Sequence, residues 1–337
     1  MNYYKRLLST LVLLATVNIS GAAQTRLELL RSVNAPGVVL VQDSLFMDEA
    51  EVANIHWLEY LAYLRKDSSF SFYQSQLPDT TALTHWIKAQ SDSVDDVYVQ
   101  YYLRYPGFRY FPLVGVAHKQ AVNYCRWRTA KVQEGYLQSH EFKKKHRKLL
   151  QQYDVAITYR LPTVGEWEAA ASGGLNAAVA PFGIMRPPAL GTRQYRLKHI
   201  RRPDDFYACL HKQDIPFGKD DQLYQMEFNV HETAYVGNSL TPFRCGNAGN
   251  LHHHLNDGFE ITDYIYSNPP NGYGLFNMVG NVAELTATPG IAKGGSFGHS
   301  IEDFTLKTDF PYDGPCEWLG FRCACTIELR RKSEARQ

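Results

Sequence analysis

The sequence has almost no net charge, no low-complexity tract and no long hydrophobic run after its N-terminus. Lys and Arg number 35 against 34 Asp and Glu, which gives a formal net charge of +1 at pH 7. So small an excess excludes the basic field with which nucleic-acid-binding proteins attract phosphate. With only 24 Gly and 16 Pro, and with 45% hydrophobic residues, the composition excludes collagen-like and disordered chains and is typical of a globular protein.

Several catalytic motifs are also missing. The chain has no P-loop and no Rossmann glycine pattern, and His231-Glu232 lacks the continuation of a zinc protease motif. None of the six cysteines forms a CxxC pair, so a zinc ribbon or a thioredoxin-type site is not expected. The run His252-His253-His254 does not make a metal site by itself, because neighbouring side chains point away from each other. We expect this run to lie in an exposed loop.

The first residues have the pattern of a targeting signal. Lys5 and Arg6 precede an apolar run over residues 7–17, and small residues follow at 21–23. This pattern predicts a secretory signal peptide over residues 1–23, with an N-terminal membrane anchor as the alternative interpretation. We therefore expect a periplasmic or secreted protein with no stable membrane anchor and no nucleic-acid partner.

Six cysteines in an exported chain can form up to three disulfides. They are Cys125, Cys209, Cys245, Cys316, Cys323 and Cys325. Their spacing alone leaves the pairing open.

Local patterns predict a few elements. Residues 48–66 have apolar side chains at helical spacing, acids in the first turn and bases in the last, and so predict an amphipathic helix. A second helix is predicted from His118, and Thr163 with Glu166 forms a capping box that begins a third. The tyrosine-rich segment 98–112 is expected to cap a core, with a carbohydrate-stacking surface as the alternative.

Six short segments have the most specific patterns of the chain. They are MDEAEVANIHWLEYL (47–61), PLVGVAHKQAVNYCRW (112–127), RLPTVGEWEAAASGG (160–174), NGYGLFNMVGNVAEL (271–285), KGGSF (293–297) and LGFRCA (319–324). In combination and in this order they resemble the formylglycine-generating enzyme, or sulfatase-modifying factor, domain family. The resemblance extends over residues 36–328 and implies one loop-rich domain with an α+β fold related to C-type lectins. A weaker similarity, through residues 280–285 and 255–259, is to non-catalytic relatives in gliding-motility and type IX secretion machinery.

The resemblance implies calcium as the cofactor. The residues implied for a first site are Asn277, Gly280, Val282 and Glu284. The residues implied for a second site are Asp257, Phe259 and either Asn247 or Asn250. Oxygen ligands of this kind suit a hard cation. The alternative for both segments is that their Asn and Gly residues only shape turns.

The same family holds copper(I) with two cysteine thiolates, soft ligands that suit this ion. In this chain the matching positions are His299 and Phe304. Both thiols are missing, so neither copper nor formylglycine-generating oxidase activity is expected. Replacement thiols from Cys316 or Cys325 are the less favoured alternative, because Cys316 would have to return through an unusual loop.

Two other cysteines, Cys125 and Cys323, match a disulfide pair of the family. The family's second bridge is absent at both ends, where Ala171 and Asp309 occupy the matching positions. The loss of both partners together supports the alignment of the motifs.

These observations predict an exported, calcium-stabilised protein that lacks the copper-binding cysteine pair and serves as a non-catalytic binding or envelope-assembly component. Its expected partner is an envelope protein or a glycan. The principal alternative is a divergent oxidoreductase with non-haem iron on the same scaffold, for which His299 and Glu302 are the only nearby candidate ligands in the sequence. A third class, a carbohydrate-binding module that uses the tyrosine-rich segment, rests on fold analogy alone.

Overall fold

The computed structural model describes most of the chain between residues 26 and 332. The described ranges are 26–83, 101–175, 262–266, 270–299 and 305–332, with four short strand segments at 193–196, 227–230, 235–236 and 239–240. The predicted signal peptide lies outside the described residues. No helix among the described residues is long and apolar enough to span a membrane.

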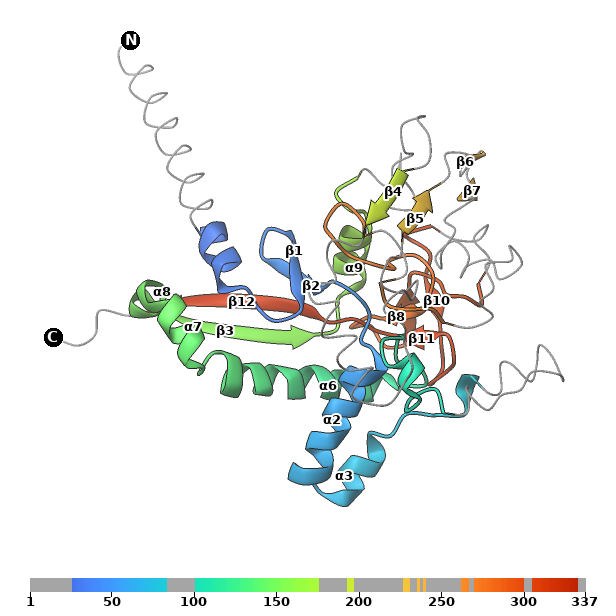
Figure 1. Ribbon diagram of the computed structural model, residues 1–337, viewed down its shortest axis with the longest axis horizontal. Helices are drawn as coiled ribbons and strands as arrows, with labels where there is room; N and C mark the ends of the chain where they lie inside the picture. Colours follow the sequence, from blue (N-terminus) through green and yellow to red (C-terminus); the bar gives the residue numbers. More distant parts are fainter. Residues whose placement is uncertain are drawn as a thin grey trace, which may run out of the picture.

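The larger of the two main sheets is antiparallel and has four strands (Figure 1). Its strand order is β1 (Val38–Gln42), β2 (Leu45–Asp48), β12 (Ala324–Arg331) and β3 (Tyr153–Arg160). The central pair, β12 and β3, stays in register from Ala324 opposite Arg160 to Arg331 opposite Tyr153. The C-terminal strand therefore joins segments that are far apart in the sequence.

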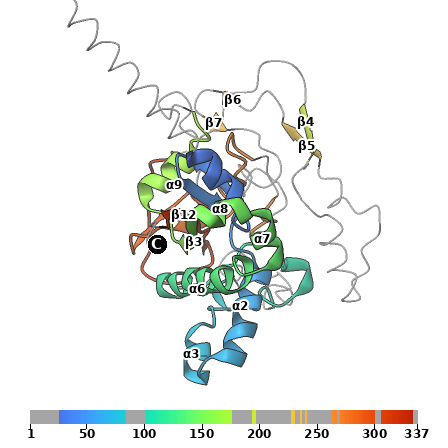
Figure 2. The ribbon, with the colours of Figure 1, turned by 90° about the vertical axis from the view of Figure 1, so that its left-hand side faces the viewer.

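The helices lie mainly on one side of this sheet, with α2 and α3 furthest from it (Figures 1 and 2). The bounds are α2 (Asn54–Asp67), α3 (Phe70–Ser75), α6 (His118–Lys131), α7 (His140–Lys145), α8 (Arg147–Gln152) and α9 (Val164–Ala171). A single turn of 3-10 helix covers Pro106–Phe108, and a π-helical turn, Val132–Tyr136, continues α6. A further helix covers residues 26–33.

A second four-stranded sheet is made of very short strands from the C-terminal third. Its order is β10 (Phe310–Pro311), β9 (Ile291–Lys293), β8 (Ala283–Leu285) and β11 (Leu319–Gly320). Only β11 and β8 run parallel to each other. Two separate pairs complete the strands: β4 (Arg193–Arg196) with β5 (Glu227–Val230), and β6 (Tyr235–Val236) with β7 (Ser239–Leu240).

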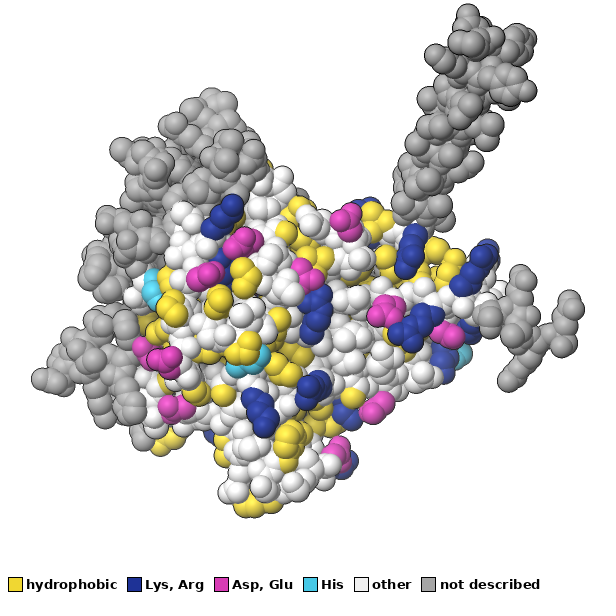
Figure 3. Space-filling model, turned by 180° about the vertical axis from the view of Figure 1, so that it is seen from behind, with side chains coloured by type: hydrophobic (Ala, Val, Ile, Leu, Met, Phe, Trp, Pro, Cys, Tyr) yellow, Lys and Arg dark blue, Asp and Glu magenta, His cyan; other side chains and the backbone are white. Residues whose placement is uncertain are grey.

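An aromatic cluster joins α2 and α6 to the C-terminal segment. The Trp57 ring stacks on Tyr124 with centroids 5.5 Å apart, and the Phe321 ring meets both edge to face. Trp57 and Phe321 are fully buried. Contacts between aromatic rings stabilise a fold by more than the apolar area that they bury. This cluster therefore helps to hold α2 and α6 in place. On the face shown in Figure 3, basic and acidic side chains are interspersed, as the small net charge predicts.

The α+β fold class and two local predictions are confirmed. Helix α6 begins at His118, and Thr163 caps α9 by accepting a hydrogen bond from Glu166 N while the Glu166 carboxylate bonds back to Thr163 N. Hydrogen bonding to Arg160 lowers the pKa of Glu166 to about 2. A third prediction, a core cap in the tyrosine-rich segment, of which residues 101–112 are described, holds for the buried Tyr102, whereas Tyr101 and Tyr105 are exposed.

The predicted first residue of one helix is wrong. The helix expected from residue 48 begins at Asn54 and not in the acidic run before it. Asp48 ends β2, and both Asp48 and Glu51 are buried instead of lying in an exposed first turn. The physical reason is tertiary: Asp48 pairs with the half-buried Arg128 and Glu51 lies near the fully buried Arg322, and these interactions outweigh the local helical pattern.

Candidate functional site

A cluster of fully buried charges forms around Arg322, in the GFR segment. Its Nε donates to both carboxylate oxygens of Glu284 at 2.8 Å, and its Nη2 lies 2.6 Å from Glu284 Oε1. Trp167 Nε1, from α9, donates to Glu284 Oε2 at 2.7 Å. All three side chains are inaccessible to solvent. Three of the motifs quoted above therefore meet in one hydrogen-bonded cluster.

The same guanidinium also binds the backbone. Nη2 donates to the carbonyl of Phe276 at 2.7 Å, and Nη1 donates to the carbonyls of Asp48 and Glu49 at 3.3 Å each. These carbonyls belong to the segment after β2 and to the loop before β8. Arg322 thus positions both loops at once, because its donors form a rigid planar fork.

A second buried carboxylate, Glu51, lies beside this pair. It accepts hydrogen bonds from Asn281 Nδ2 at 2.9 Å and Asn277 Nδ2 at 3.3 Å, and its Oε2 is 3.9 Å from Arg322 Nη2. Burial raises the pKa of Glu51 to about 8, with Arg322 opposing the shift and Glu284 adding to it. Two carboxylates therefore share one guanidinium, which leaves an excess of negative charge in the core whenever both are ionised.

The first predicted calcium site lies within this cluster. Asn277 and Gly280 have positive φ angles of 49° and 84°, so the backbone curls between Asn277 and Glu284. Two buried carboxylates beside one guanidinium would suit a cation, because a bound cation would favour the ionised form of Glu51. The Glu284 carboxylate, however, already accepts two donors at each oxygen, from Arg322 and Trp167. Glu284 would become a calcium ligand only by exchanging one of these donors for the ion.

The second predicted calcium site is not described. Its residues Asp257 and Phe259, and both candidate partners Asn247 and Asn250, lie outside the described residues. The same is true of the run His252-His253-His254.

At the first of the two positions that the resemblance matched to copper-binding cysteines, a histidine is held in place. His299 Nδ1 lies 2.7 Å from Ser296 Oγ, and the imidazole packs edge to face against Phe310 and Trp318, with centroids 4.4 and 4.8 Å away. Burial lowers the pKa of His299 to about 4, so the ring is neutral at pH 7. The other position, Phe304, lies outside the described residues, as does Glu302.

Neighbouring groups hold the turn around Ser296 in place. Lys293, fully buried at the start of KGGS, donates to Glu168 at 2.8 Å and to Asp309 at 3.1 Å. Burial raises the pKa of the Cys316 thiol to about 12, so this thiol is protonated at neutral pH. Within the described ranges, no group of three or more His, Cys, Asp or Glu side chains comes together as a metal site. Nothing there favours the iron-dependent alternative.

The cysteines matched to a family disulfide are brought together. Cys125 Sγ, on α6, lies 3.6 Å from Cys323 Sγ, just before β12, and both are buried thiols. A disulfide would require the sulfur atoms to approach to about 2.05 Å. The disulfide therefore stays a prediction. The fold does bring the two cysteines, which are 198 positions apart in the sequence, close to each other.

Sequence reasoning did not foresee Glu51 or Asn281 as members of the buried cluster. Both lie in segments quoted for the resemblance, but a single sequence does not reveal which carboxylate will face which arginine. The only signal was the acidic run at 48–51 directly after a strand, which matched a helix start equally well.

A comparison with protein families gives one match over almost the whole chain. The model of the FGE-sulfatase family, described as "Sulfatase-modifying factor enzyme 1-like domain", matches residues 15–327. The range contains every motif discussed above.

Curated relatives match over a shorter stretch. A formylglycine-generating enzyme of Thermomonospora curvata is 30% identical over 128 residues, which are 38% of this chain and 26% of that protein. The formylglycine-generating enzyme of Mus musculus is 29% identical over 128 residues, which are 38% of this chain and 22% of that protein. The match thus spans about a quarter of the length of these relatives.

Solved structures with low similarity include PvdO from Pseudomonas aeruginosa, with 17% identity and a TM-score of 0.33 over 65% of this chain and 63% of that one. CarF has 16% identity and a TM-score of 0.36 over 84% and 87% of the two chains. Treponema denticola variable protein 1 has 15% identity and a TM-score of 0.37 over 87% and 92%. The family match, and not these superpositions, assigns the chain.

Removal of the Arg322 guanidinium tests the buried cluster. We expect Arg322→Met to lower the free energy of unfolding by about 3–5 kcal/mol, because Glu284 is left buried without a partner charge. Arg330→Met is the matched control: its partner Glu328 is exposed, so a loss below about 1 kcal/mol is expected. Urea denaturation measures both, and equal losses would contradict the central role of Arg322.

Non-reducing peptide mapping tests the disulfide. We expect the exported, oxidised protein to yield a cross-linked peptide that contains Cys125 and Cys323, with a stabilisation of about 4–5 kcal/mol for so long a loop. Cys125→Ser should abolish this peptide, whereas Cys325→Ser should leave it unchanged. A Cys125–Cys325 peptide, or a free Cys125 in the oxidised protein, would overturn the pairing.

Proposed function

This chain belongs to the sulfatase-modifying factor enzyme 1-like domain family, and we propose that it is an exported, non-catalytic binding or assembly component of the cell envelope. In this proposal the family scaffold is retained and its oxidase chemistry is lost. The expected partner is an envelope protein or a glycan.

The observation that carries the proposal is the pair Ser296 and His299. The motif spacing puts His299 where the first copper thiolate of the family would be, and its Nδ1 is engaged with Ser296 Oγ at 2.7 Å. An imidazole is a harder ligand than a thiolate and does not supply a thiol for disulfide or copper(I) chemistry. At the second position, Phe304 has a phenyl ring that cannot coordinate a metal at all.

The described cysteines offer poor replacements. Cys316 has a thiol pKa raised to about 12 by burial, and burial likewise raises the pKa of Cys325 to about 12. A copper(I) site needs thiolates, and a thiol that resists ionisation gives up its proton only at a large cost in free energy. This supports a loss of the oxidase centre over its relocation.

Calcium is a second part of the proposal. Its support is the pair of buried carboxyl groups, Glu51 and Glu284, beside the single guanidinium of Arg322, together with the curled backbone of residues 277–284. Asn277 and the carbonyl groups of Gly280 and Val282 would hold the ion, and it would supply structural stabilisation only. Glu284 would join them after exchanging one of its present donors.

The loss of oxidase activity is tested with copper(I) and a sulfatase-type peptide. We expect the protein neither to compete with a copper(I) chelator nor to convert the peptide cysteine to formylglycine, measured by mass spectrometry beside an active formylglycine-generating enzyme. The double variant His299→Cys with Phe304→Cys should gain copper(I) binding, because it restores two soft ligands. Copper-dependent formylglycine formation by the unmutated protein would refute the proposal.

The calcium proposal is tested by thermal unfolding with calcium and with a chelator. We expect chelation to lower the Tm by several degrees, because an ion bound only to the native state stabilises it by mass action. Asn277→Ala should abolish this calcium dependence. Asn271→Ala is the control, since Asn271 shapes the turn at 271–275 without being an expected ligand: it should lower the Tm yet keep the dependence. Identical melting curves with and without calcium would remove calcium from the proposal.

A further inference from the structure

A basic pocket lies on the projection formed by α2 and α3, next to the turn at residues 101–105. Its volume is about 320 Å³, and the residues that line it are Leu58, Leu61, Ala62, Arg65, Lys66, Tyr73 and Arg104. Figures 1 and 2 show α2 and α3 extending away from the sheet, below α6. The pocket is therefore built from elements other than those that hold Ser296 and His299.

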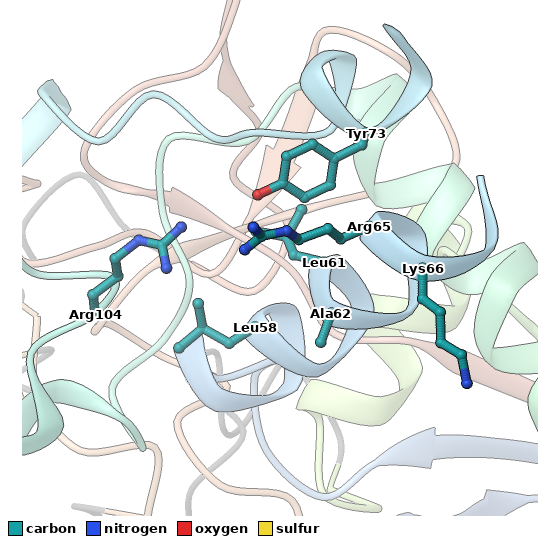
Figure 4. A pocket seen from close by; sticks show the side chains of 7 residues that line it. All are labelled: Leu58, Leu61, Ala62, Arg65, Lys66, Tyr73 and Arg104. Carbon is teal, nitrogen blue, oxygen red and sulfur yellow. The ribbon is translucent and has the colours of Figure 1, made fainter. Parts of the chain in front are cut away.

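The two arginines of this pocket face each other. Figure 4 shows the guanidinium groups of Arg65 and Arg104 pointing toward the same space from opposite sides, with the Tyr73 hydroxyl directed into it. Leu58 and Leu61 lie along the α2 side, and Lys66 points away from the centre. Donors thus converge on one point above an apolar surface.

The basic side chains here have no partner carboxylates. No acidic residue lines the pocket, and none of Arg65, Lys66 and Arg104 forms an ion pair with another described residue. Elsewhere in the described part of the chain, Arg128 is paired with Asp48 and Arg160 with Glu166. Both arginines are exposed, so water and salt weaken their mutual repulsion, and an anion between them would be attracted by both charges.

A second hollow extends the pocket toward an aromatic surface. It has a volume of about 400 Å³ and is lined by Arg65, Ser68, Phe70 and Tyr73, so it shares Arg65 and Tyr73 with the first. Phe70 is 72% exposed, the most exposed large hydrophobic side chain of the described residues. An anion held by Arg65 would therefore have an aromatic surface beside it.

We propose that this pocket binds a phosphate monoester, with the phosphate between Arg65 and Arg104 and the organic part against Phe70 and Tyr73. A guanidinium forms paired hydrogen bonds with two oxygens of an anion. A carboxylate has only two oxygens and satisfies one such fork, whereas the terminal oxygens of a phosphate monoester can bind two forks and accept a hydrogen bond from Tyr73. The ester is either a soluble organic phosphate or the monoester headgroup of a lipid.

Isothermal titration with inorganic phosphate and phenyl phosphate tests the pocket. We expect saturable binding of both probes, tighter for phenyl phosphate. Binding of either probe should be about tenfold or more weaker in Arg65→Ala and in Arg104→Ala, because each substitution removes charge-assisted hydrogen bonds. Arg65→Lys keeps the charge and should retain part of the affinity. Arg147→Ala is the matched control: Arg147 is an exposed arginine at the start of α8, so its loss should leave binding unchanged.

Vesicle sedimentation distinguishes the two sources of the ester. Binding to phosphatidylcholine vesicles that contain phosphatidic acid, in preference to phosphatidylglycerol vesicles of equal charge, and lost in Arg65→Ala and Phe70→Ser, would identify a lipid headgroup. Phenyl phosphate binding without vesicle binding would identify a soluble ester. The proposal is overturned if no phosphate probe binds saturably, if benzoate binds as tightly as phenyl phosphate, or if Arg147→Ala weakens binding as much as Arg65→Ala.

Discussion

The buried guanidinium of Arg322 is the constraint on which the rest of the structure depends. It neutralises Glu284 in a solvent-free environment and at the same time binds carbonyl groups of two separate loops. Moving these charges out of water costs several kcal/mol per ion, so the cluster is favourable only when its hydrogen bonds are complete. The fold supplies them from α9, β8 and the segment after β2. Arg322 therefore defines one arrangement of these elements and excludes looser ones.

Much of the family signature consists of residues that contact one another inside the fold. The signature residues that the structure describes are engaged in internal contacts: Glu166 with Arg160, Lys293 with Glu168, and Glu284 with Arg322. These pairs stabilise turns and short strands that have little hydrogen bonding of their own. A match to these signature residues therefore indicates that the chain has the family's fold.

Buried and exposed charges differ in whether they have partners. In the core, Arg322 and Lys293 have carboxylate partners, because an unpaired buried charge would unfold the protein. On the α2–α3 projection, Arg65 and Arg104 have none among the described residues and face the same space. Water hydrates an exposed guanidinium, so it needs no carboxylate partner. The two guanidinium groups are therefore available to bind an external anion. Binding can thus change on this projection while the core stays the same.

The sequence by itself determined the family, the α+β class and those elements whose signals are local. The helix from His118 and the cap at Thr163 follow from side chains within a few residues of each other, so a single sequence suffices to predict them. Only the tertiary structure decided where the acidic side chains of residues 48–51, before α2, are placed. Residues 48–51 match a helical first turn, yet Glu51 is buried opposite Asn281 and near Arg322, more than two hundred positions away. Pairing across such separations depends on how the sheets bring the chain together, and the free energy of satisfying a buried charge exceeds the small local preference for a helix start.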